Sequence, residues 1–260
     1  MEPLDFLTAD EKRVLNQIRG HDYLYTFGLV EEFILPFVLD HARPHLSGND
    51  ARVRALLGFA SEEAKHIDLF KRFRADFLAR FGSDCEVIGP PEAIAQAVLA
   101  RHPLGVALTI LHIEWMTQRH YIDSVKDDGD LDPQFKSLLK HHWMEEAQHA
   151  KLDTLMVQAL SEGCTEEEID RGIAEYLEIG GMLDQGLQQQ VKFDLDSFER
   201  ATGRVLTAGE RERFLEVQGQ AVRWTYLGSG MTHKNFLASV NMLRPEMRRK
   251  IEEEIAPVFS

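Results

Sequence analysis

The sequence predicts an all-α fold, and three features of its patterning support this. Apolar residues recur with helical spacing over segments of about 20 to 35 residues. Glycine and proline gather between these segments, in stretches such as 42–50, 82–91 and 127–133. Alternation of the strand type is scarce. The chain has 260 residues, 44% of them hydrophobic, which is enough for a sizeable core, so we expect a single all-α domain over 1–260.

The expected helices follow one another along the whole chain. They lie near 8–20, 22–43, 50–81, 91–101, 103–126, 132–161, 165–201 and 207–242, and a short helix closes the chain. The last two long helices begin at capping boxes, Thr165 with Glu168 and Thr207 with Glu210. Pro36 lies inside its helix, where it predicts a kink or a backbone bond that is already lost.

The two C-terminal long helices carry no carboxylate that we can assign to an apolar face. Gly228 and Gly230 lie inside the last of them, where they permit another helix to approach closely. A break in the helix is the alternative. His233 follows them and is expected to be a satisfied core or surface histidine rather than a metal ligand. These helices are therefore expected to cover the rest of the fold.

The composition excludes several kinds of partner. The chain has 29 Lys and Arg against 43 Asp and Glu, a net charge of −14, so we expect no binding to nucleic acid or to an anionic membrane. No apolar run approaches the roughly 18 residues of a membrane span. The N-terminus lacks the basic and apolar regions of a signal peptide, so we expect a cytoplasmic protein. Cys85 and Cys164 form no CxxC pair, which excludes sites built on four thiolates.

Four glutamates lie at the centre of the most apolar face of their helices. An α-helix turns about 100° per residue, so the direction of each side chain follows from its position. Glu146, for example, falls within about 40° of Leu139, Ala150 and Val157. The four are Glu31, Glu63, Glu114 and Glu146, one on each of the helices near 22–43, 50–81, 103–126 and 132–161.

Three histidines share these apolar faces. His66 follows Glu63 by three residues, His149 follows Glu146 by three, and His142 precedes Glu146 by about one turn. Neighbouring polar residues point aside or toward solvent, namely Glu32, Glu62, His141 and Glu145. Glutamate and histidine therefore recur together at helical spacing on the predicted apolar faces.

Metal ions would explain why so many carboxylates face a core. A buried carboxylate costs several kcal/mol unless it is paired, and four of them would also repel one another. Two divalent cations would balance the four charges, and neutral histidines would complete the coordination. A single Glu-x-x-His pair is more often a surface contact. Here, however, 32 residues separate Glu31 from Glu63 and also Glu114 from Glu146, and this repeat favours Glu31 over Glu32.

This arrangement of four glutamates with two Glu-x-x-His pairs resembles the ferritin-like diiron carboxylate superfamily. The resemblance covers about residues 20–161, and it implies a ferritin-like four-helix bundle with additional N-terminal and C-terminal helices. Residues 162–260 would form the covering helices. Oxygen and nitrogen ligands without thiolate suit two iron ions, with manganese as the alternative.

His142 makes the pattern most similar to the arylamine N-oxygenases of the p-aminobenzoate type, in which a third histidine binds one iron. The resemblance implies seven metal ligands, Glu31, Glu63, His66, Glu114, His142, Glu146 and His149. The alternative for His142 is a core histidine that donates to a ligating carboxylate. Beside the ligands we expect Asp153, which would accept from a ligating histidine, and Tyr121 and Gln118 on the same face. We assign no catalytic residue beyond the metal site.

We expect an O₂-activating dinuclear iron oxygenase or oxidase that acts on a small organic molecule, with N-oxygenation of an amine as one reaction. Such an enzyme needs an external electron donor. The alternatives are a ferroxidase or iron-handling protein and a manganese-containing redox protein. A homodimer is compatible with the sequence, which does not identify the substrate.

Overall fold

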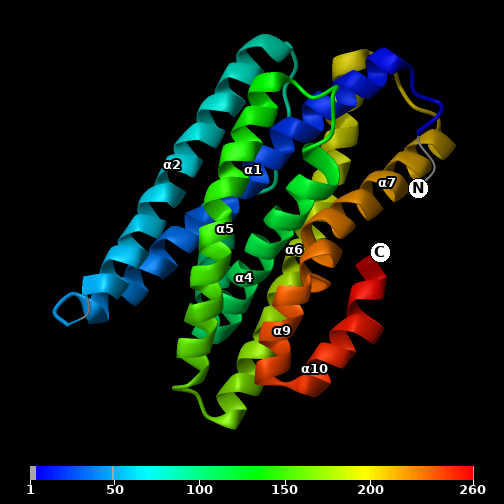
Figure 1. Ribbon diagram of the computed structural model, residues 1–260. Helices are drawn as coiled ribbons and strands as arrows, with labels where there is room; N and C mark the ends of the chain where they lie inside the picture. The colour runs from blue at the N-terminus through cyan, green and yellow to red at the C-terminus, as the bar shows by residue number, and fades with distance from the viewer. Residues whose placement is uncertain (1–3, 49, 260) are drawn as a thin grey trace. The chain divides into compact units, whose positions relative to one another are not determined.

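The computed structural model is all-helical and describes residues 4–48 and 50–259 (Figure 1). No strand occurs within these two ranges. The chain divides into two compact units, residues 1–97 with 185–221 and residues 98–184 with 222–260. It passes from one unit to the other inside three helices, α3 (Pro91–Leu99), α6 (Glu166–Thr202) and α7 (Ala208–Arg223). The predicted fold class, all-α, is confirmed.

The first unit is built on α1 (Ala9–Ala42) and α2 (Asp50–Phe81), which pack side by side (Figure 1). The prediction of separate helices near 8–20 and 22–43 is wrong, because α1 is continuous. Gly20 costs a helix only about 1 kcal/mol. Burial of Ile18 and Leu24 on either side of it outweighs that cost. Pro36 is also accommodated inside α1.

The second unit is built around α4 (Pro103–His120), which packs against α5 (Pro133–Ser161) (Figure 1). Nearly the whole length of α4 is buried, from Leu104 to Thr117. A π-helical turn, η2 (Tyr121–Val125), continues α4 within the range predicted as one helix. Because α4 is covered on all sides, it forms the core of this unit.

Glycine lets other segments approach α4 closely. A Cβ atom at Gly105 would lie 2.8 Å from the carbonyl oxygen of Gly172, and one at Gly230 would lie 2.4 Å from His112 Cδ2. Real Cβ atoms do not approach other heavy atoms so closely. The close approach predicted for Gly230 is therefore confirmed, and only glycine fits at these two positions without a shift of the neighbours.

The helix predicted near 207–242 is interrupted, so that prediction is wrong. After α7 the chain forms a π turn, η3 (Trp224–Gly228), and one further turn, α8 (Ser229–Met231). A new helix, α9 (Lys234–Leu243), then begins at a cap in which His233 Nδ1 accepts from the backbone N–H of Asn235. This cap gives the new helix its own start and explains the break.

The remaining elements are short, and both predicted capping boxes are present. In each box the threonine N–H donates to the glutamate carboxylate, at 2.7 Å for Thr165 and Glu168 and 2.8 Å for Thr207 and Glu210. The short elements are η1 (Arg43–His45), α10 (Pro245–Lys250), η4 (Ile251–Ile255) and η5 (Ala256–Phe259). Within the described part of the chain, no helix combines the length and apolarity needed to cross a membrane.

Candidate metal centre

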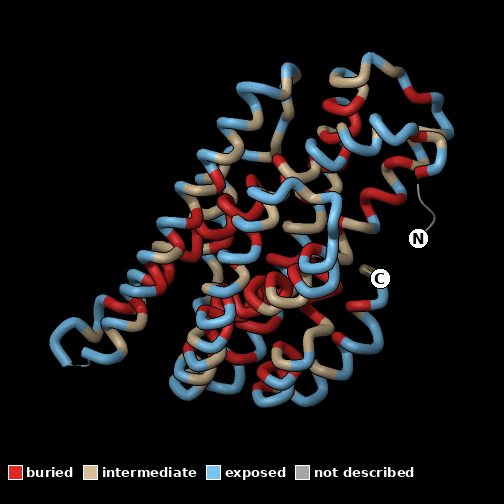
Figure 2. Tube along the Cα trace, turned by 45° about the horizontal axis from the view of Figure 1, so that its top comes forward, coloured by how far each residue is buried: buried red, intermediate tan, exposed pale blue. Residues whose placement is uncertain are grey.

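Buried and exposed residues alternate along the long helices (Figure 2), and the polar residues predicted to face inward are on the buried side. In the first unit these are Glu31 on α1 and Glu63 and His66 on α2, which are only 3%, 0% and 2% exposed. Glu32, one residue along α1, is half-buried and forms an ion pair with Lys71 at 2.7 Å. The inward direction calculated from helix geometry is therefore confirmed for Glu31, Glu63 and His66.

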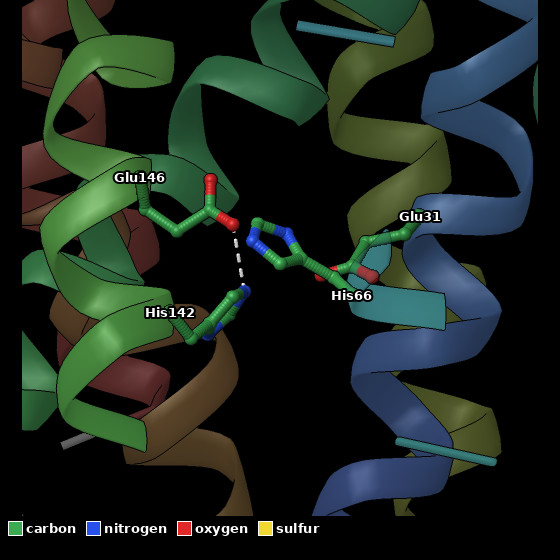
Figure 3. Close-up of side chains that lie close together, drawn as sticks. All are labelled: Glu31, His66, His142 and Glu146. Atoms are coloured by element: carbon green, nitrogen blue, oxygen red, sulfur yellow. Dashed lines mark ion pairs between the residues drawn. The ribbon is translucent and has the colours of Figure 1, made fainter. Parts of the chain in front are cut away.

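Glu31 and His66 approach each other from α1 and α2 (Figure 3). His66 Nδ1 lies 3.7 Å from Glu31 Oε1. This distance is too long for a hydrogen bond. Two atoms that bind the same metal ion at about 2.1 Å stand about 3 to 4 Å apart, so the spacing fits two ligands of one ion.

Aromatic side chains surround this part of the first unit. Phe59 and Phe70 of α2 are each 1% exposed, and the Phe70 ring packs edge-on against Phe27 of α1 with centroids 6.3 Å apart. Gly28 of α1 faces the same ring, since a Cβ atom there would make an ordinary van der Waals contact with Phe70 at 3.9 Å. The carboxylates of Glu31 and Glu63 therefore lie in a dry part of the unit, where an ionised group depends on its partners.

In the second unit, α5 presents the Glu146 carboxylate between two histidines, one of which, His142, is drawn beside it in Figure 3. His142 Nε2 lies 2.7 Å from Glu146 Oε1, and His149 Nδ1 donates to Glu146 Oε2 at 2.6 Å. The spacing of one turn before and three residues after Glu146 places both rings on its face of the helix. Glu114 is buried on the neighbouring α4, while His141 is exposed.

The two histidines determine the charge of Glu146. Burial by itself raises the pKa of this carboxyl group, but His142 and His149 outweigh burial and hold its pKa well below the ordinary value of 4.5. Glu146 is therefore ionised although it is buried. An ionised carboxylate is the form that binds a metal ion.

The three residues predicted to support the ligands also lie in the second unit. Asp153 of α5 is 1% exposed. Tyr121 is buried and stacks on the ring of Trp143, with centroids 4.7 Å apart. Gln118 Nε2 donates to the backbone carbonyl of Trp143 at 2.9 Å. Gln118 of α4 and Tyr121 of η2 thus both pack against Trp143 of α5, the neighbour of His142.

Two buried groups of glutamate and histidine side chains could hold metal ions. Taken unit by unit, their members are Glu31, Glu63 and His66 in the first unit and Glu114, His142, Glu146 and His149 in the second. All donor atoms are carboxylate oxygens and imidazole nitrogens, and the free cysteines Cys85 and Cys164 are not among them. This donor chemistry fits iron or manganese and does not fit a thiolate-bound metal.

Sequence reasoning missed a second set of buried acids, in the first unit. Asp22 of α1 and Asp194 of α6 are 2% and 1% exposed. The expectation that the C-terminal long helices carry no inward carboxylate is therefore wrong at Asp194. The signal was present, since Gln190, Asp194 and Ser197 recur at helical spacing among the buried residues Leu187, Val191, Leu195 and Phe198.

Comparison of the chain with protein-family models, with curated protein sequences and with solved structures found no match.

Proposed function

We propose that the chain is an O₂-activating oxidoreductase that uses two metal ions, iron or manganese, to oxidise a small organic molecule. In this proposal two sets of four side chains would hold the metal ions, and Glu146 belongs to both sets. The ligands would be Glu31, His66, His142 and Glu146 for one ion and Glu63, Glu114, Glu146 and His149 for the other. The observation that carries the proposal is that all seven side chains are buried, three of them in the first unit and four in the second.

Charge supports two ions rather than one. Glu31, Glu63, Glu114 and Glu146 are buried and contribute four negative charges when ionised. Two divalent ions balance these charges, and neutral histidines add donor nitrogens without changing the balance. A single ion would leave two negative charges uncompensated away from water, which is costly. The metal-bound protein is therefore expected to contain about two ions per chain.

The protein's own residues would prepare the site in three ways. Before a metal ion binds, His142 and His149 lower the pKa of Glu146, and their contacts at 2.7 Å and 2.6 Å hold its carboxylate in place. Phe59 and Phe70 in the first unit, and the buried length of α4 in the second, exclude water from the ligands. Two ferrous ions at such a site supply the electrons that reduce O₂, so the chain has to provide geometry and a dry environment rather than a reactive side chain.

N-oxygenation of an amine is the reaction that we propose in particular. It rests on His142, since a third histidine is the feature that the sequence shares with the arylamine N-oxygenases. An external electron donor would return the metal ions to the reduced state. Iron storage, in which the site oxidises ferrous iron only, and a manganese redox protein are the competing functions that an experiment has to separate.

The test measures metal content and O₂ consumption. The protein is purified from iron-rich and from manganese-rich medium, its metal content is measured, and the ferrous form is mixed with O₂ with and without an aromatic amine. We expect about two ions per chain and O₂ uptake coupled to an oxidised amine product. Mineral growth with excess ferrous iron and no organic product would instead indicate iron storage. A chain that takes up no metal from either medium contradicts the whole proposal.

A further inference from the structure

A cavity of about 440 Å³ lies in the second unit, near the C-terminal end of α4. It is lined by Arg119 of α4, Ile122 and Asp123 of η2, Trp143 of α5, Thr232 and His233 between α8 and α9, and Lys234 at the start of α9. Its volume falls within the range of cavities that hold small molecules. None of the seven predicted metal ligands lines this cavity.

The lining has an excess of positive charge, although the chain as a whole carries −14. Arg119 and Lys234 contribute two positive charges, and Asp123 contributes one negative charge. Asp123 is already engaged, because Arg119 Nε contacts its Oδ2 at 3.2 Å. Lys234 is exposed and forms no ion pair with any residue that the structure describes. One uncompensated cation is therefore left at this cavity.

Hydrogen-bond donors also exceed acceptors here. Arg119 Nη1 donates to Thr232 Oγ1 at 2.8 Å and to the Ser229 carbonyl at 3.4 Å, but its Nη2 has no acceptor among the described residues. His233 Nδ1 accepts from the backbone, so in the neutral ring Nε2 carries the hydrogen. With Lys234, three groups can donate to a ligand. A group that only accepts, a carboxylate or a phosphate, matches them.

Apolar surface accompanies these donors. Ile122 is 43% exposed, and the indole of Trp143 lines the cavity next to it. One face of Trp143 is occupied by the Tyr121 ring, which holds the indole in place. Trp115 holds His233 in the same way, by stacking at 4.7 Å with 9° between the ring planes. The cavity thus has rigid aromatic walls beside a cationic end.

From these features we infer that the cavity binds a small organic anion, with its acidic group at Arg119, His233 and Lys234 and its apolar body against Trp143 and Ile122. The carboxylate or phosphate accepts from the three donors. The apolar body covers side chains that are otherwise in contact with water. Inorganic anions lack this second part and bind more weakly. The inference does not rest on the proposed metal chemistry.

Tryptophan fluorescence offers a direct test, because the chain has three tryptophans and all of them lie at or beside the cavity. Trp143 lines it, Trp115 stacks on His233, and Trp224 lies under the Arg119 guanidinium at 5.0 Å. Titration of the full-length protein with phenylacetate should give a saturable change in emission at millimolar concentration or below. Phenylacetamide, which has the same shape without the charge, should bind about tenfold more weakly. Inorganic phosphate should compete only weakly.

Matched variants locate the binding. Lys234→Gln should weaken phenylacetate binding about fivefold. Lys140→Gln removes the same charge from an exposed position of α5 outside the cavity and should leave binding unchanged. Because Lys234 is exposed, its variant is expected to keep the wild-type melting temperature. Equal binding of phenylacetate and phenylacetamide, or equal binding by the two lysine variants, overturns the inference, as does the lack of any saturable change. Phosphate that competes as well as phenylacetate overturns the assigned apolar part.

Discussion

Two buried acidic clusters behave in opposite ways, and they differ only in the neighbours of the carboxylate. In the second unit, His142 and His149 hold the pKa of Glu146 well below its ordinary value although the group is buried. In the first unit, burial and the neighbouring Asp194 raise the pKa of Asp22 well above its ordinary value. Burial raises the pKa of Asp194 itself to about 6, from an ordinary 3.8.

The neighbours of a buried carboxylate therefore decide whether it is charged and could bind a metal ion. Burial always disfavours the charged form, so the partner decides whether the proton stays. Thr26 and Gln190 donate to Asp22 and Asp194, at 3.2 Å and 2.9 Å, and the charge of Arg19 also lowers both pKa values, but together these do not offset burial. Carboxyl groups whose pKa values are raised in this way keep their protons to a higher pH and need no cation. A carboxylate kept ionised by two histidines is prepared for a cation.

Glu146→Gln should cause the largest loss of metal binding. The carboxamide keeps the shape of the side chain but removes the charge that both proposed metal ions share. We expect metal content to fall from about two ions per chain to nearly none, since a bridging ligand contributes to both ions. Metal analysis after dialysis checks this. Glu145→Gln, the adjacent residue that points aside, should keep wild-type metal content, and equal loss in both variants would contradict the assignment.

His142→Ala should have a smaller effect that also tests the role of this histidine. If His142 binds one ion, metal content should fall from about two to about one ion per chain. A histidine that only supports Glu146 would weaken binding, by about 10- to 100-fold, without changing the number of ions. Titration with ferrous iron under anaerobic conditions distinguishes the two. The exposed neighbour provides the control, and His141→Ala should behave as wild type.

His112 of α4 is buried but has no carboxylate partner among the residues that the structure describes. His112 bonds to the hydroxyl of Tyr176 and to the carbonyl of Tyr226, at 2.8 Å and 3.0 Å, and burial lowers its pKa to about 4 from an ordinary 6.5. Between pH 6.5 and pH 4 the ring of His112 takes up a proton in the unfolded chain but stays neutral in the folded chain. The free energy of unfolding therefore decreases as the pH falls from 6.5 to 4.

His112→Gln should remove this part of the pH dependence. The free energy of unfolding of wild type relative to His112→Gln is expected to decrease by about 1 to 3 kcal/mol between pH 7 and pH 4. Urea unfolding at several pH values measures it. The variant loses stability at pH 7 as well, because the contacts to Tyr176 and Tyr226 change. A difference between the two proteins that is independent of pH would show that His112 is not held neutral by burial.

Asp194→Asn should change the free energy of unfolding by the smallest amount, and its pH dependence should be opposite to that of His112→Gln. The folded-state pKa of about 6 lies above the ordinary 3.8, so wild type loses stability as the pH rises through this window. The carboxamide cannot ionise and still accepts from Gln190. The variant should therefore be more stable than wild type at pH 7, by about 1 to 2 kcal/mol, and no more stable at pH 4. The exposed Asp76→Asn serves as the control and should change little at either pH.

Much of the fold could be predicted from helical periodicity and from local signals at helix ends. The boxes at Thr165 and Thr207 start their helices as predicted, because capping depends on residues only three positions apart. These signals did not decide the break before α9, which the sequence offered only as the alternative to close packing at Gly228 and Gly230. A histidine cap is uncommon, and the glycines before it are also explained by close packing on His112.

The buried direction of the site residues was also predictable, since it requires only the angle of each residue about its helix axis. Asp194 was missed, although its angle about the axis of α6 places it among Val191, Leu195 and Phe198. The cavity beside Arg119 was beyond sequence reasoning for another reason. Arg119, Trp143 and Lys234 come from three distant segments, and no local pattern brings their side chains together. Long-range proximity of this kind depends on packing.

The π turn at the end of α4 has a consequence for this cavity. Residues Tyr121–Val125 have one residue more per turn than an α-helix allows, as if a single residue had been inserted. Ile122 and Asp123, which line the cavity, lie within that turn. Deletion of one residue there would restore the α-helical register and rotate every later side chain of the segment by about 100°. The cavity could thus be gained or lost by a single deletion or insertion. Glu114, two turns earlier on α4, would keep its position.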